Sequence, residues 1–126
     1  MKLIDVRLTG TTDTAGAATI NADRSVFAYL ERVEWIDGSL DDGVDAVLSV
    51  QSTPSGVAET LLTLTDANND AIYYPRTLMH GETGTALTGT AGGDRTRYLV
   101  NGVPRLAITS GGGAKTGGCI LYLVED

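Results

Sequence analysis

The fold class depends most on residues 25–36, whose sequence is Ser-Val-Phe-Ala-Tyr-Leu-Glu-Arg-Val-Glu-Trp-Ile. In a strand, side chains alternate between two faces, and here both faces are apolar. One face carries Phe27, Tyr29, Val33 and Trp35, and the other carries Val26, Ala28, Leu30 and Ile36. The same residues also fit the 3.6-residue stripe of a helix. Because aromatic and β-branched residues favour strands, and Asp37-Gly38 follows as a hairpin turn, we predict a strand that begins at Ser25 and ends at Ile36, with a helix as the alternative.

The rest of the chain repeats short apolar-polar alternations separated by turns. Further strands are predicted at residues 2–9, 17–22, 44–53, 57–65, 71–79, 95–101, 103–110 and 119–125. Pro75 interrupts one of them, which predicts an edge position or a bend because proline cannot donate to a ladder. Residues 80–94, rich in Gly, Thr and Ala, predict an extended loop. We therefore expect one all-β domain over residues 1–126, an antiparallel sandwich or jelly-roll-like barrel of about eight strands.

The composition excludes several classes of partner. The 126-residue chain has 9 Lys and Arg against 16 Asp and Glu, a net charge of −7, which opposes binding to nucleic acid or to an anionic membrane face. The charged residues near the N-terminus are unlike those of a signal peptide, and no apolar run approaches the ~20 residues of a membrane span. We expect a soluble protein. Its single cysteine, Cys119, lies in an apolar run and is predicted to be a small buried hydrophobe.

A glycine-rich segment at residues 111–116 superficially resembles a phosphate-binding loop. That motif requires Gly, four residues, Gly, Lys and then Ser or Thr. Thr109 and Ala114 occupy the two glycine positions, and the following residues predict a strand where a phosphate site needs a helix. The segment is therefore interpreted as a hairpin loop.

Two acidic segments are candidate cation sites. Asp66, Asn68 and Asp70 match the first three ligand positions of a calcium loop, but Ala71 replaces the sharp-turn glycine and Thr77 replaces the bidentate glutamate. A second acidic stretch is formed by Asp37, Asp41, Asp42 and Asp45. Both are interpreted as solvated turns, with an opportunistic cation site as the alternative.

No catalytic, cofactor or metal site is predicted. His80 is the only histidine, so neither a transition-metal site nor an activated Cys119 nucleophile has the partners it needs. The aromatic residues are predicted to pack mainly in the core, with a sugar-stacking platform or an interface anchor as the alternative. Tyr73 and Tyr74 are adjacent, so in a strand they face opposite sides and at least one lies near the surface. A binding or structural role is therefore favoured over an enzyme.

Several segments together resemble small virion proteins of tailed bacteriophages. The resemblance covers most of the chain and is carried by Arg24-Ser25-Val26-Phe27, residues 33–38 (VEWIDG), 45–50 (DAVLSV) and 114–120 (AKTGGCI). It implies a capsid decoration, or cement, protein that is assembled in the host cytoplasm, binds the major capsid protein on the outside of the virion, and often forms a homotrimer. A carbohydrate- or receptor-binding module of a phage tail or fibre is the alternative.

Overall fold

The computed structural model describes residues 1–52, 55–78 and 95–125, and these residues form ten strands and no helix. In chain order the strands are β1 (Lys2–Thr11), β2 (Ala18–Asn21), β3 (Val26–Ile36), β4 (Asp45–Gln51), β5 (Ala58–Leu64), β6 (Ala71–Tyr73), β7 (Arg76–Leu78), β8 (Arg95–Arg97), β9 (Leu99–Thr109) and β10 (Thr116–Glu125). No helix in this part of the chain is long and apolar enough to cross a membrane. The all-β prediction is confirmed.

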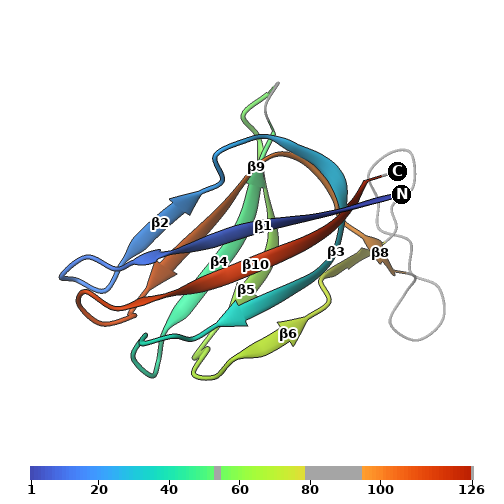
Figure 1. The fold of residues 1–126 in the computed structure, drawn as a ribbon. Helices are drawn as coiled ribbons and strands as arrows, with labels where there is room; N and C mark the ends of the chain where they lie inside the picture. Colours follow the sequence, from blue (N-terminus) through green and yellow to red (C-terminus); the bar gives the residue numbers. More distant parts are fainter. Residues whose placement is uncertain (53–54, 79–94, 126) are drawn as a thin grey trace.

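Eight of the strands form two antiparallel layers (Figure 1). The first sheet has the order β1-β10-β3-β6, and the second has the order β2-β9-β4-β5. Along the chain, β1, β3, β6 and β10 lie in the first sheet and alternate with β2, β4–β5 and β9 in the second, which is the topology of a jelly roll. The sheets are joined where residues 26–29 of β3 pair with residues 99–102 of β9. They do not close into a barrel, so the sandwich is the form that the chain adopts.

The core lies between the two layers and is made of the inward-facing residues that the alternation predicts. Its largest fully buried side chain is Trp35, whose indole Nε1 donates a hydrogen bond of 3.0 Å to the backbone oxygen of Ala67. This bond ties the turn after β5 to the centre of the core. Cys119 is also buried there, as predicted.

Strand β3 contains an irregularity that the sequence analysis did not predict. Leu30 pairs with Leu123 and Arg32 pairs with Tyr122, so Glu31 is an extra residue on the β3 side of the ladder. This is a β-bulge, and it reverses the faces of all residues that follow it.

The bulge makes the predicted common face of Phe27, Tyr29, Val33 and Trp35 wrong. Trp35 and Val33 point into the core, with exposed fractions of 0% and 1%, whereas Phe27 is 65% exposed. On the N-terminal side of the bulge the core is instead supplied by Val26, Ala28 and Leu30. The strand assignment itself is confirmed, and the helix alternative is excluded.

Three strand boundaries also differ from the predictions. Pro75 separates β6 from β7, and β6 lies at the edge of the first sheet, as the proline indicated. The predicted break near residue 102 is absent, because β9 continues through Gly102. That glycine has a φ of +144°, and a Cβ atom there would lie 1.9 Å from the backbone oxygen of Gln51. Strand β10 begins at Thr116 and so includes two glycines that were assigned to the preceding loop.

Candidate functional site

The glycine-rich loop at residues 111–115 packs against another loop and leaves no phosphate cradle. Thr12 Oγ1 donates a hydrogen bond to the backbone oxygen of Gly112 and accepts one of 2.9 Å from the backbone N–H of Lys115. The N–H of Gly111 donates to the backbone oxygen of Gly16 at 2.9 Å. The loop leads into strand β10, as predicted, but its interpretation as a hairpin loop is wrong, because β9 and β10 do not pair and the loop connects the two sheets.

The two acidic turns, predicted separately, lie side by side and are joined by hydrogen bonds. Asn68 Oδ1 accepts the N–H of Gly43 at 2.7 Å, and Asp70 Oδ1 accepts the N–H of Asp37 at 2.8 Å. On the same side, Asp45 Oδ1 accepts the N–H of Asp66 at 3.0 Å. These oxygens therefore hold the two turns together. Within the described ranges no group of three or more His, Cys, Asp or Glu side chains is placed to hold a metal ion.

The Asp37 carboxyl of these turns has a perturbed acidity. Its Oδ1 is buried and has no hydrogen-bond partner among the described residues. Burial, followed by repulsion from Asp42 and Asp70, raises the pKa of the Asp37 carboxyl above its ordinary value. The ionised Asp37 carboxylate therefore destabilises the folded turn modestly.

The Cys119 thiol is unreactive in the structure. Burial raises the pKa of the Cys119 thiol to about 12, so the reactive thiolate is not formed near neutral pH. His80 and the predicted loop at residues 80–94 lie outside the described residues.

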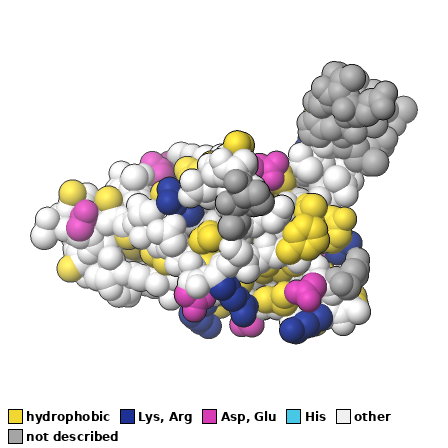
Figure 2. Space-filling view, turned by 90° about the horizontal axis from the view of Figure 1, so that it is seen from above, with side chains coloured by type: hydrophobic (Ala, Val, Ile, Leu, Met, Phe, Trp, Pro, Cys, Tyr) yellow, Lys and Arg dark blue, Asp and Glu magenta, His cyan; other side chains and the backbone are white. Residues whose placement is uncertain are grey.

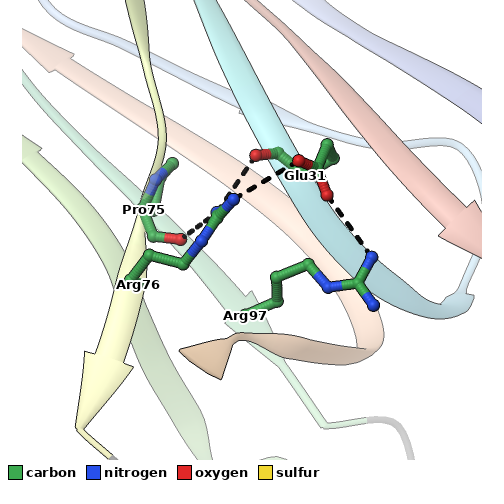
Figure 3. Close-up of polar contacts among 4 residues, drawn as sticks. All are labelled: Glu31, Pro75, Arg76 and Arg97. Carbon is green, nitrogen blue, oxygen red and sulfur yellow. Dashed lines mark hydrogen bonds and ion pairs between the residues drawn. The ribbon is translucent and has the colours of Figure 1, made fainter. Parts of the chain in front are cut away.

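The β3 bulge directs Glu31 toward the small β7–β8 sheet (Figure 3). Glu31 Oε1 lies 3.4 Å from Arg76 Nη2, and Glu31 Oε2 lies 3.3 Å from Arg97 Nη1. Arg76 Nη1 also donates to the backbone oxygens of Glu31, at 3.1 Å, and Pro75, at 2.8 Å. A single carboxylate therefore clamps both strands of the β7–β8 sheet to β3.

An exposed apolar surface adjoins this clamp, where β3 and β9 cross between the sheets. We call it the arch patch, and it consists of Phe27, Tyr29, Val57 and Leu99, with exposed fractions of 65%, 36%, 67% and 43%. Tyr29 and Leu99 are directly opposite in the β3–β9 ladder, and Phe27 is two residues from Tyr29 on the same face. Val57 and Leu99 line one shallow groove. Figure 2, seen from above the view of Figure 1, shows hydrophobic side chains exposed on this side of the molecule with charged side chains beside them.

Arg97 connects the clamp to the arch patch. The Arg97 guanidinium lies 5.0 Å from the centre of the Tyr29 ring, a cation–π distance, while it also pairs with Glu31. Arg97 thus holds the Tyr29 ring at the centre of the patch, and the bulge residue Glu31 holds Arg97.

The remaining aromatic residues divide between the core and the surface. Tyr73 and Tyr98 pack against the core, whereas Tyr74 is 58% exposed, so the expectation that at least one of the adjacent tyrosines lies near the surface is confirmed. Tyr122 lies on the outer face of the first sheet, where Arg32 stacks 4.6 Å from its ring centre and its hydroxyl donates to Glu34 Oε2 at 3.2 Å.

Sequence reasoning missed both the clamp and the arch patch. The signal was present in β3, where two charged residues, Glu31 and Arg32, interrupt the alternation of apolar residues. Such a break between two apolar runs of opposite parity is typical of a bulge. Leu99 and Val57 carry no comparable signal, because isolated apolar residues near strand ends are common.

Comparisons with known proteins add no family or neighbour. The chain matches no family model, no curated protein and no solved structure. The function must therefore be argued from the surfaces of this fold.

Proposed function

We propose that this chain is a structural virion protein that binds the outer surface of a tailed-bacteriophage capsid and stabilises it, as a decoration or cement protein. The observation that carries the proposal is the arch patch, an apolar surface with an aromatic centre and an arginine at its rim. Interfaces between proteins are enriched in these residue types. The resemblance of the sequence to small phage virion proteins supplies the kind of partner.

The construction of the patch supports a role in docking. Three of its four members, Phe27, Tyr29 and Leu99, are in the long strands β3 and β9, which belong to the packed sandwich. Side chains on rigid strands lose little conformational freedom when they bind. Several exposed apolar side chains gathered in one place also carry more meaning than the same number scattered over a surface.

One side of the patch is positively charged, although the chain has a net charge of −7. Arg76, Arg95 and Arg97 lie there in β7 and β8, and Glu31 faces two of them, whereas Glu59 lines the groove beside Val57 and Leu99. A partner with an apolar depression and acidic groups around it would be complementary to this surface. We assign that character to the site on the major capsid protein. Each bound copy then stabilises the assembled shell by mass action.

Co-sedimentation with undecorated capsids of the bacteriophage that carries the gene tests the proposal. We expect saturable binding by the wild type, and loss of about thirtyfold in affinity for Phe27→Ser and for Leu99→Ser, the size expected for residues central to an interface. The matched control is Val47→Ser, because Val47 is a partly exposed apolar residue of β4 outside the patch. If no wild-type protein sediments with the capsids, the proposal is wrong.

A carbohydrate- or receptor-binding role is the second candidate, and one observation favours it. Tyr74 presents an exposed ring of the kind that stacks on sugars, and jelly rolls also serve as lectins. A glycan array probed with the wild type and with Tyr74→Ala tests this role. Tyr73→Phe is the control, because Tyr73 packs against the core. A glycan bound by the wild type and lost only in Tyr74→Ala would favour the second candidate.

A further inference from the structure

Strand β1 leaves one long backbone edge open. It pairs with β10 in an unbroken register from Lys2 opposite Glu125 to Thr11 opposite Thr116. On its other side none of the described residues forms a ladder with it. An edge of this kind presents unpaired N–H and C=O groups to solvent and is a template for another strand.

The other sheet edges are protected, whereas β1 is not. Strands β2 and β6 have only four and three residues, and the register of β5 against β4 is broken by an extra residue, Leu61. Strand β1 has ten residues, no proline and no bulge, and its charged Asp5 and Arg7 point outward, where they do not block pairing. Shortening, proline and bulges are common means of blocking an edge, and β1 has none of them, so its backbone is free to pair with another strand.

Two charged residues in the middle of β1, Asp5 and Arg7, have no opposite charge facing them in β10. Asp5 and Arg7 are exposed on the outer face, and their neighbours in β10 are Tyr122 and Ile120. Neither residue forms an ion pair in the part of the chain that the structure describes. The two opposite charges are separated by Val6, which points into the core.

We propose that β1 pairs antiparallel with β1 of a second copy of this chain, across a two-fold axis at Val6, so that the two first sheets become one continuous sheet. In this register Asp5 lies opposite Arg7 of the second copy, and the symmetry repeats the pair. Ile4 lies opposite Leu8 of the second copy on the inner face, so apolar residues meet apolar residues. Opposite charges in directly facing positions favour a cross-strand pairing.

The same charges select this register over its neighbours. An axis at Asp5 would place two aspartates face to face, and an axis at Arg7 would place two arginines face to face, both of which are repulsive. A shift by one residue would turn the apolar row toward solvent. A groove of about 490 Å³ lies beside the edge, between β1 and residues 20–24.

The inference does not depend on capsid binding and is tested on the purified protein alone. We would measure molar mass by light scattering after gel filtration, over a range of loading concentrations. The wild type is expected to form a concentration-dependent dimer of the 13.1 kDa chain. Asp5→Arg and Arg7→Asp each replace two attractive pairs by two repulsive ones and should weaken the dimer about tenfold or more. The double variant, Asp5→Arg with Arg7→Asp, restores opposite charges and should return the dissociation constant to within about threefold of the wild-type value.

Glu59→Arg is the control, since Glu59 is an exposed residue of β5 and its substitution changes the net charge as Asp5→Arg does. It should leave the dimer unchanged. A wild type that remains a monomer at its highest soluble concentration overturns the inference, as does a trimer, which would instead agree with the homotrimer implied by the resemblance. A double variant that dissociates as readily as the single variants also overturns it. Circular dichroism of each variant establishes that the exposed substitutions leave the fold intact.

Discussion

Removal of the Glu31 carboxylate tests whether the β3 bulge clamps the β7–β8 sheet. Glu31 forms two ion pairs of 3.4 and 3.3 Å, and the three side chains are between 28% and 43% exposed. Pairs with this much solvent contact contribute about 0.2–1 kcal/mol each. Glu31→Ala should therefore lower the free energy of unfolding by about 1 kcal/mol. At about 2.1 cal/mol/K of unfolding entropy per residue, that loss lowers the melting temperature of a chain of this size by about 4 °C.

Urea denaturation and amide hydrogen exchange would measure the effect. Because the clamp is local, protection should fall most in β7 and β8 and least in β10, which lies in the core. The loss of stability should shrink in high salt, since the pairs are partly exposed. Glu59→Ala is the control, because Glu59 has no ion pair within the described residues. If Glu31→Ala unfolds at the same urea concentration as Glu59→Ala, with unchanged exchange in β7 and β8, the clamp does not exist.

Three further predictions concern the core and the acidic turns. Trp35→Phe should destabilise the protein by about 2–4 kcal/mol in urea, because it leaves the Ala67 carbonyl unpaired and opens a cavity, and a loss below ~1 kcal/mol would contradict the buried hydrogen bond. The Cys119 thiol should resist a disulfide reagent in the native state and react fully in denaturant, and rapid native labelling would contradict its burial. Asp37→Asn should raise the melting temperature at pH 7: since folding raises the pKa of Asp37, its ionised form costs stability above that pKa. The gain should therefore vanish as the pH falls and the wild-type carboxyl becomes protonated, and an equal gain at all pH values would be contrary to this reasoning.

The strands were largely predictable because apolar and polar residues alternate along them in the same order in which buried and exposed residues alternate in the structure. In β1, Ile4, Val6 and Leu8 alternate with polar residues in the sequence, and these three side chains face the core. In β4, the same holds for Ala46, Leu48 and Val50. A half-buried strand has one buried face and one exposed face, so the alternation in its sequence indicates which side chains point into the core.

The arch patch was missed because it arises from one register shift whose exact position the sequence leaves open. Glu31 and Arg32 are acceptable on either face of an edge or bulge, so the sequence does not mark which residue is the extra one. The ladder between β3 and β10 decides it, and those strands are far apart in the chain. Because of this one extra residue, Phe27 does not share a face with Trp35, as was predicted, but lies at the surface.

The acidic turns show a different limit. Asp66, Asn68 and Asp70 were correctly assigned to a turn, but their hydrogen-bond partners come from the turn between β3 and β4. The spacing of residues within one loop can indicate ligands that this loop supplies, but it does not indicate that two loops far apart in the sequence contact each other. The carboxylate and amide oxygens that match a cation motif are accepting backbone N–H groups here, which is the commoner use of Asp and Asn in turns.

The central claim, that this protein binds a capsid through the arch patch and stabilises it, is tested most directly by the melting temperature of the shell. Undecorated capsids of the bacteriophage that carries the gene would be heated in the scanning calorimeter alone, with saturating wild type, and with Phe27→Ser at the same concentration. The account predicts that the wild type raises the shell transition and that Phe27→Ser, although folded, raises it much less. A shell transition unchanged by the wild type, or raised equally by both proteins, would contradict it.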